Sequence, residues 1–177
     1  MTAQGDAQRR YAAVIGPGRC DERTAAVAYE VGAGLAQAGF TVVTGGELGA
    51  MEAASSGARH AGGFVVGILP GLDRSRANRY ADITVATGIG HARNLAVVAS
   101  ADVVVAVGGE WGTLSEIALA GVLHRPVVLV DGWRLEHATG LPSEVHYAGD
   151  AAEAVSLAVG VAVKARSQEE APSPGEA

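Results

Sequence analysis

Residues 108–116, GGEWGTLSE, combine the residue types of an anion-binding loop with a carboxylate one helical turn away. They follow an apolar run at residues 103–107 and precede a helical pattern at residues 117–123, so we expect a buried strand, a glycine-rich turn and a helix. Glycine lets the backbone approach a ligand closely, and a helix start offers unpaired N–H groups at the positive end of its dipole. The pattern therefore indicates a phosphate site with Glu116 beside it.

Thr113 and Glu116 also have the spacing of a capping box. In that motif a threonine at the helix start and a glutamate three residues later satisfy the first backbone N–H groups. Thr113 can cap the helix and still line a ligand site. Glu116 cannot do both, because a side chain folded back on the helix start does not reach a ligand. The sequence leaves both roles of Glu116 open.

Three more loops carry paired or near-paired glycines. Gly16 and Gly18 follow residues 11–15, Gly45 and Gly46 follow residues 40–44, and Gly88 and Gly90 follow residues 82–86. The first loop begins like a dinucleotide-binding fingerprint, but position 21 is Asp where that motif has its third glycine. We also expect no acidic residue near the end of the second strand to bind a ribose, so an NAD site is not expected. The loops are either tight turns or the wall of a site for an extended ligand.

The motif HARN at residues 91–94 opens a helix after the loop with Gly88 and Gly90. Arg93 is placed to face the centre of the expected sheet edge, where a guanidinium can hold a phosphate through two N–H groups. The alternative is a surface arginine paired with a neighbouring acid. Asn94 is a further candidate for ligand binding, whereas His91 alone is not assigned as a base. Other arginines are expected at the same edge, which favours an anionic ligand: Arg19, Arg23, Arg74, Arg76 and Arg79.

Apolar runs alternate with helical patterns along the chain. Strands are expected at residues 11–15, 40–44, 64–69, 82–86, 102–107 and 127–130, and helices at residues 22–38 and 50–61, from about 91 to 100, after residue 116, and from Asp150 onward. Residues 131–149 show no regular pattern. The alternation predicts an α/β fold, a single-domain, Rossmann-like, doubly wound parallel sheet. Such sheets bind ligands beyond the carboxyl ends of their strands, where the glycine-rich loops lie.

The polar ends of the chain, residues 1–10 and 167–177, are predicted to be disordered, which leaves one domain at residues 11–166.

The net charge of −6 argues against nucleic acid and membrane surfaces as partners. The single cysteine, Cys20, excludes an internal disulfide and fits the cytoplasm. The histidines lack metal-ligand spacing, so no metal site is expected. The single lysine, Lys164, is far from the glycine-rich loops, which argues against pyridoxal phosphate, and no other cofactor is expected.

With these loops assembled, the chain resembles the LOG (Lonely Guy) family, also described as "putative lysine decarboxylase". That family carries the motif PGGxGTxxE, preceded by a helix with HERK. The matching residues here are Gly108, Gly109, Glu110, Trp111, Gly112, Thr113 and Glu116, with His91–Asn94 in place of HERK. The run from VVGILPG to ATGIGHARN is similar to a bacterial branch related to the molybdenum-cofactor carrier protein.

The resemblance implies a phosphoribohydrolase, which hydrolyses the N-glycosidic bond of a nucleoside 5′-monophosphate and releases ribose 5-phosphate. It implies Glu116 and Arg93 as catalytic residues, and Gly109, Gly112 and Thr113 as the phosphate loop. The alternative is a non-catalytic carrier of molybdenum cofactor, a pterin, or of a related nucleotide. Both imply a phosphorylated small molecule as the ligand, and the family also implies a homodimer paired through helices that flank the site.

Three positions depart from the LOG pattern. Gly108 replaces the proline, Glu110 replaces the second glycine, and HARN loses the acid and the lysine of HERK. Glu110 adds a negative charge that would oppose a phosphate by about 1 kcal/mol or more unless its side chain points outward. The departures bear more on the reaction than on the fold, so hydrolase and carrier both stay open.

Overall fold

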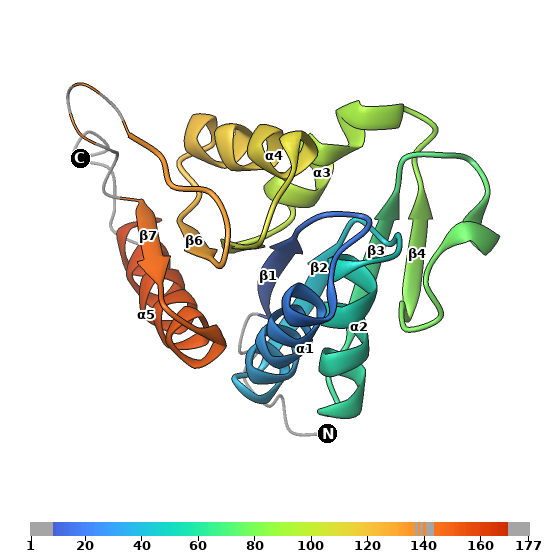
Figure 1. The fold of residues 1–177 in the computed structure, drawn as a ribbon, viewed down its shortest axis with the longest axis horizontal. Helices are drawn as coiled ribbons and strands as arrows, with labels where there is room; N and C mark the ends of the chain where they lie inside the picture. The colour runs from blue at the N-terminus through green and yellow to red at the C-terminus, as the bar shows by residue number, and fades with distance from the viewer. Residues whose placement is uncertain (1–8, 137, 139, 141–143, 170–177) are drawn as a thin grey trace, which may run out of the picture.

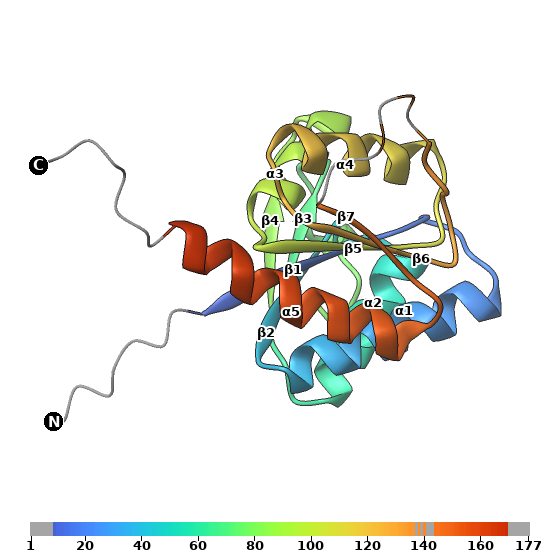
Figure 2. The same cartoon turned by 90° about the vertical axis from the view of Figure 1, so that its left-hand side faces the viewer.

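The structure is a computed structural model that describes residues 9–136, 138, 140 and 144–169. These residues form a parallel sheet between two helical layers (Figures 1 and 2). The strands are β1 (Arg10–Ile15), β2 (Phe40–Thr44), β3 (Val65–Leu69), β4 (Ile83–Ala86), β5 (Val103–Val107), β6 (Val127–Val130) and β7 (Val145–Ala148). The α-helices are α1 (Glu22–Gln37), α2 (Ala50–His60), α3 (Arg93–Ala99), α4 (Trp111–Val122) and α5 (Ala151–Glu169). Two 3₁₀ turns, η1 (Arg74–Arg76) and η2 (Gly90–Ala92), lie in the connections.

The strand order is β4-β3-β2-β1-β5-β6-β7, and every neighbouring pair is parallel. The chain therefore builds outward from β1 in one direction through β4 and then returns to β5 on the other side of β1. The doubly wound parallel sheet predicted from the sequence is confirmed. The order reverses between β1 and β5, and this reversal opens a crevice at the carboxyl ends of the strands.

The central strands are buried on both sides because they are continuous apolar runs. In β5, Val103, Val105 and Val107 pack with α1, α2 and α5, whereas Val104 and Ala106 pack with α3 and α4. Figure 2 shows α1, α2 and α5 on one side of the sheet and α3 and α4 on the other. The sheet is thus a rigid base whose carboxyl edge carries the glycine-rich loops.

Two glycines bring α1 and α2 into close contact. A Cβ atom at Gly32 would overlap the carbonyl oxygen of Ala54, and one at Gly57 would overlap the carbonyl oxygen of Tyr29. Each helix therefore approaches the backbone of the other, a distance that only glycine permits at these positions. The two helices follow β1 and β2, so this contact helps fix the loops at the ends of those strands.

The structure corrects the sequence interpretation of residues 131–149. They contain a seventh strand, β7, which pairs in parallel with β6. Its four residues are only partly buried, so the segment has no continuous apolar run that would predict a strand. Asp150 caps α5 as expected, because its Oδ1 accepts from the backbone N–H of Glu153 at 2.8 Å.

The predicted domain limits of 11 and 166 differ slightly from the ordered elements. β1 begins at Arg10, and α5 continues to Glu169. Residues 1–8 and 170–177, which were predicted to be disordered, lie outside the described residues. Within the described part of the chain, no helix is both long and apolar enough to span a membrane.

Candidate functional site

A cavity of about 540 Å³ opens at the carboxyl edge of the sheet, beside the reversal between β1 and β5. The loops after β1, β2, β3, β4 and β5 all contribute to its wall. Its lining includes seven of the residues predicted from the sequence: Gly16, Gly18, Arg93, Asn94, Gly112, Thr113 and Glu116. The cavity therefore brings two of the phosphate-loop candidates, Gly112 and Thr113, together with both catalytic candidates.

Helix α4 begins at Trp111, three residues before Leu114, the first helical residue that a Thr113 capping box requires. Its N-cap is Glu110, whose side chain makes no capping hydrogen bond. The capping-box interpretation of Thr113 and Glu116 is therefore wrong, because both residues lie inside the helix. The N–H groups of the first helical turn have no partner within the helix, and this turn borders the cavity.

Thr113 lies in that first turn and is 2% exposed, yet its Oγ1 has no hydrogen-bond partner among the described residues. A buried hydroxyl without a partner costs free energy, because it has lost its water. Thr113 lines the cavity, so a ligand oxygen there would supply the missing bond. The unpaired hydroxyl and the helix dipole together favour an anion.

Glu116 lies one turn further along α4 and is 8% exposed. Burial raises the pKa of its carboxyl to about 7, while nearby Arg93 lowers it and Glu47 raises it further. Burial dominates because a carboxylate loses its hydration there. A carboxyl group that exchanges its proton near neutral pH, in a cavity wall, suits general acid–base chemistry.

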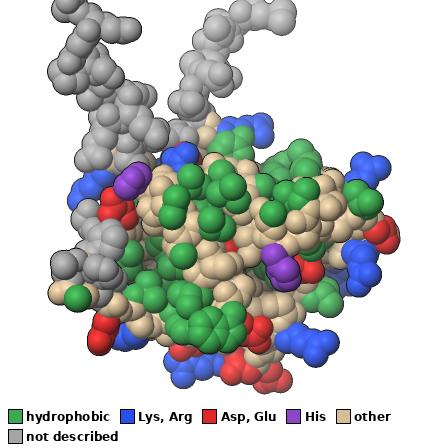
Figure 3. Space-filling model, turned by 90° about the horizontal axis from the view of Figure 1, so that it is seen from above, with side chains coloured by type: hydrophobic (Ala, Val, Ile, Leu, Met, Phe, Trp, Pro, Cys, Tyr) green, Lys and Arg blue, Asp and Glu red, His purple; other side chains and the backbone are tan. Residues whose placement is uncertain are grey.

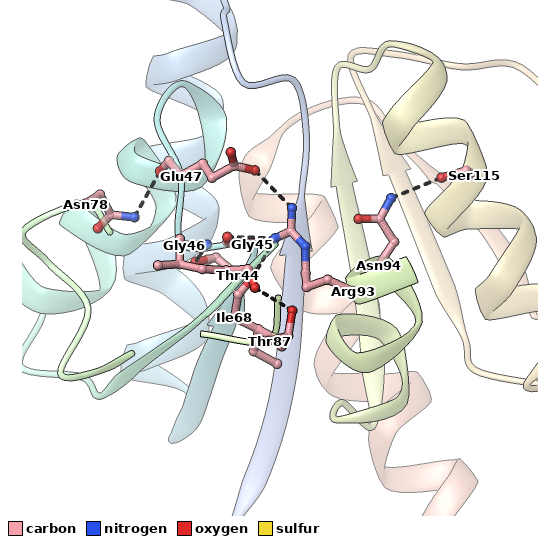
Figure 4. Close-up of polar contacts among 11 residues, drawn as sticks. Thr44, Gly45, Gly46, Glu47, Ile68, Asn78, Thr87, Arg93, Asn94 and Ser115 are labelled. Atoms are coloured by element: carbon pink, nitrogen blue, oxygen red, sulfur yellow. Dashed lines mark hydrogen bonds and ion pairs between the residues drawn. The ribbon is translucent and has the colours of Figure 1, made fainter. Parts of the chain in front are cut away.

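Arg93 is buried, at 6% exposure, and its donors are mostly used within the protein. Its Nη1 donates to the carbonyl oxygens of Gly45 at 2.6 Å and Ile68 at 2.7 Å, and its Nη2 pairs with Glu47 Oε2 at 2.9 Å (Figure 4). Its Nε is buried without a partner. Arg93 does pair with an acid, as the alternative interpretation proposed, but the pair borders the cavity instead of lying on an open surface.

Asn94, the neighbour of Arg93, faces the other side of the crevice. Its Nδ2 donates to Ser115 Oγ on α4 at 3.2 Å, so Asn94 links α3 to the helix that carries Glu116 (Figure 4). Asn94 is 7% exposed and lines the cavity, as predicted for a ligand-binding residue. Its role in binding remains a prediction.

Four predicted ligand-binding glycines, Gly45, Gly46, Gly108 and Gly109, are absent from the cavity lining. Gly45 contributes the carbonyl that holds Arg93, and the Gly46 N–H donates to Thr44 Oγ1 at 3.1 Å. Gly108 and Gly109 have φ angles of +64° and +145°, which turn the chain from β5 into α4. These glycines shape the loops behind the cavity wall.

The segment after β6 packs against this turn. A Cβ atom at Gly109 would lie 2.7 Å from the indole nitrogen of Trp133, and one at Gly132 would overlap the carbonyl oxygen of Gly108. The Trp133 ring also contacts the Trp111 ring, with centroids 5.5 Å apart. Trp133 therefore supports the turn between β5 and α4 from behind, a role that the sequence did not reveal because residues 131–149 lacked a regular pattern.

The sequence interpretation missed Glu47, although it stands inside the glycine-rich loop after β2. The expectation of no acidic residue near the end of the second strand was wrong, since Glu47 follows Thr44 by three residues and lines the cavity. A charged residue between glycines at a strand end was the available signal. Arg76, expected at this edge, and Glu110, part of the glycine-rich motif, also line the cavity. The lining residues that were not assigned to the site are Pro17, Leu48, Met51, Leu69, Pro70, Gly71, Asp73 and His91.

The expected gathering of arginines at one edge is only partly observed. Arg76 lines the cavity with Arg93, and Arg23 pairs with Asp131 at 3.0 Å on the surface. Arg79 donates to the Tyr80 hydroxyl at 2.9 Å, and the Tyr80 ring packs against His60 at the far end of α2. The loop from β3 to β4 must return to the amino edge because the two strands are parallel, and it carries Arg79 away from the site.

The acidic side chains of the site do not form a metal centre. Within the described residues, no group of three or more His, Cys, Asp or Glu side chains is arranged to hold a metal ion. Glu110 is exposed and lines the cavity, so its charge stands at the start of α4. The site is thus a mixed-charge cavity lined by a buried acid, a buried arginine and the first turn of α4.

A Rossmann-like sheet with a cavity at its switch point defines the class of this protein. Residues 9–156 match the SLOG cluster4 family, so the chain belongs to that family. It is 35% identical over 116 residues to a cytokinin riboside 5′-monophosphate phosphoribohydrolase of Mycobacterium tuberculosis, a match that covers 60% of this chain and 62% of the relative. The predicted resemblance to LOG proteins is confirmed by this relative and by the family match.

Two solved structures share the fold along nearly their whole length. One is the molybdenum cofactor carrier protein of Chlamydomonas reinhardtii, with 33% identity, a TM-score of 0.79, and coverage of 88% of this chain and 99% of the other. The second is the molybdenum cofactor binding protein of Rippkaea orientalis, with 34% identity, a TM-score of 0.77, and coverage of 85% and 96%. The chain thus resembles an enzyme, a carrier protein and a cofactor-binding protein.

Proposed function

We propose that this protein binds a phosphorylated nucleotide or pterin-like molecule in the cavity, and that its activity is hydrolysis of a nucleoside 5′-monophosphate at the N-glycosidic bond. The observation that carries the proposal is Glu116, a buried carboxyl with a pKa raised to about 7 in the wall of the cavity that α4 borders. The unpaired Thr113 hydroxyl supports phosphate binding at that helix start. The phosphoribohydrolase relative supports the reaction class.

The proposed reaction breaks the bond between C1′ of the ribose and a nitrogen of the base. Water adds to C1′ as the bond to the base breaks, one proton of the water passes to Glu116, and Glu116 returns it to the nitrogen of the leaving base. The products are the free base and ribose 5-phosphate. Positive charge develops on the sugar in the transition state, and the carboxylate of Glu116 stabilises it. A pKa near neutrality lets the same group accept and return a proton.

A carrier function is the second candidate, and the state of Arg93 favours it. Its Nη1 donates to two backbone carbonyls, and its Nη2 pairs with Glu47. The two terminal nitrogens of the guanidinium are therefore not available to bind a phosphate in a bidentate manner. Similarity to the carrier protein of Chlamydomonas reinhardtii also supports it. In that case the cavity would hold a phosphorylated pterin without breaking a bond.

One experiment separates the two functions. The purified protein is incubated with AMP, GMP, CMP and UMP, and free base is measured by chromatography. Hydrolysis predicts base release that Glu116→Gln lowers by about 100-fold or more, because proton transfer by a positioned group contributes that much. Glu110→Gln, on the same cavity wall, is the control and should retain release. Saturable binding without base release would favour the carrier function. If none of the four monophosphates binds, the phosphoribohydrolase proposal is contradicted.

The proposal also includes a cytoplasmic location and a homodimer. The exposed apolar side chains of α3 and α4 support the homodimer, since Leu95 is 45% and Val122 is 74% exposed. Both helices border the cavity, so a partner seated on them would lie beside the site.

A further inference from the structure

Glu47 is held in a fixed loop at the carboxyl end of β2. Asn78, which is 4% exposed, binds this loop twice: its backbone N–H donates to the Gly46 carbonyl at 2.8 Å, and its Nδ2 donates to the Glu47 carbonyl at 3.0 Å. The Gly45 carbonyl in turn accepts from Arg93. The backbone that carries Glu47 is therefore anchored on both sides of the loop.

The Glu47 side chain lines the cavity and is 45% exposed. One carboxylate oxygen, Oε2, pairs with Arg93 Nη2 at 2.9 Å. Among the described residues, the other oxygen takes part in no hydrogen bond, and Figure 4 shows it directed away from Arg93. Glu47 therefore offers an acceptor whose position is set by its bond to a buried guanidinium.

Arg93 already supplies Glu47 with an opposite charge, so a ligand has no need to bring one. A neutral donor such as a hydroxyl group suits the second oxygen better than a phosphate, which the carboxylate would repel. Glu47 and Glu116 line the same cavity, and the charge of Glu47 raises the pKa of the Glu116 carboxyl. A hydroxyl near Glu47 therefore lies close to the proposed reacting centre.

The distance between the loops after β2 and β5 matches the length of a ribose 5-phosphate. Glu47 follows β2 and the turn into α4 follows β5, with β1 between them. Neighbouring strands lie about 4.8 Å apart, so the two loops are separated by about 10 Å. An extended ribose 5-phosphate, with a hydrogen bond at each end, bridges such a gap. Its phosphate would lie at Thr113 and its hydroxyl groups at Glu47.

We propose that Glu47 determines specificity for ribonucleotides, because its outward carboxylate oxygen accepts a hydrogen bond from the 2′- or 3′-hydroxyl of the bound ribose. The proposal rests on the proposed nucleotide-binding function. It assigns to Glu47 a positive selection for a ribose diol over a deoxyribose.

The test compares dissociation constants for AMP, 2′-deoxy-AMP and 3′-deoxy-AMP, or kcat/KM values if the ligands are hydrolysed. A hydrogen bond to a charged group predicts that at least one deoxy analogue binds the unmodified protein about 10-fold or more weakly than AMP. Glu47→Gln should reduce this ratio to about twofold, since its amide oxygen remains committed to Arg93. Asp73→Asn, which changes another acid of the cavity wall, should leave the ratio unchanged.

The ratio of the dissociation constants for a deoxy analogue and for AMP is informative, because a variant that weakens binding of both nucleotides equally leaves this ratio unchanged. Equal binding of AMP and both deoxy analogues by the unmodified protein would overturn the role of Glu47 while leaving nucleotide binding intact. An unchanged ratio in folded Glu47→Gln, checked by circular dichroism, would overturn it as well. If neither AMP nor ribose 5-phosphate binds, the proposed function itself fails and the Glu47 proposal fails with it.

Discussion

Glu116 shows how a shift of three residues in a helix start changes the chemistry available to a side chain. A helix with Thr113 as its N-cap would fold Glu116 back onto the helix start, whereas α4 has Glu110 as its N-cap and leaves Glu116 in the cavity wall. The residue types and spacing predicted an acid beside an anion site. They did not predict the pKa near 7, because the burial of Glu116 and the nearby charges of Arg93 and Glu47 depend on contacts distant in sequence.

The raised pKa of Glu116 predicts a pH-dependent cost in stability. The folded state holds this proton more tightly than the unfolded chain, whose ordinary pKa is 4.5. The stabilisation is therefore full below pH 4.5 and is lost as the pH rises to about 7. In urea titrations, the free energy of unfolding of Glu116→Gln relative to the unmodified protein should rise over this range by up to about 3 kcal/mol and then level off.

The control for this measurement is Glu110→Gln. Glu110 is an exposed acid on the same cavity wall, so the variant removes one carboxylate without touching the buried position. A rise of similar size in that variant would assign the effect to the net charge of the cavity and would contradict the burial of Glu116 as its cause.

The elements of this fold differ in how well local sequence patterns predict them. Continuous runs such as β5, and helices bounded by glycine such as α1, are predicted because their signals are local. β7 has no such signal, since it is a short, partly buried edge strand that depends on β6 for its hydrogen bonds. The contact of Arg93 with Gly45 and Ile68 was equally hidden, because it joins three strand ends that only the sheet order brings together.

The close contact between α1 and α2 predicts a large cost for one added methyl group. Gly57→Ala improves helix propensity but places Cβ against the Tyr29 carbonyl, so the helices must separate. We expect a loss of about 1–3 kcal/mol in the free energy of unfolding. Gly160→Ala in α5 is the matched control, because a Cβ atom there meets no atom within 4 Å, and it should stabilise by about 0.5–1 kcal/mol. Equal melting temperatures for the two variants would contradict the interlocked contact.

At the scale of the whole molecule, the two faces of the sheet are covered unequally. One face carries α1, α2 and α5, whereas α3 and α4 form the outer layer on the other. Figure 3 looks down on the α3–α4 side and shows hydrophobic side chains gathered on it. Exposed apolar residues on or next to these two helices are Ile89, Leu95, Trp111 and Val122. An apolar surface beside a ligand site favours contact with another protein chain.

The proposed homodimer places this α3–α4 surface at the interface, since a two-fold axis lets one apolar patch cover its own copy. Val122→Glu, at a position 74% exposed, should convert the dimer to a monomer in sedimentation velocity at micromolar concentration. Burial of an unpaired carboxylate at an interface costs several kcal/mol, whereas the isolated fold is unaffected by a charge at an exposed site. Val163→Glu is the control, because Val163 is 52% exposed on α5, on the opposite side of the sheet, and should leave the dimer intact. If the unmodified protein is a monomer, the homodimer is contradicted. If only Val163→Glu loses the dimer, the interface lies on the α5 side and the α3–α4 interface is contradicted.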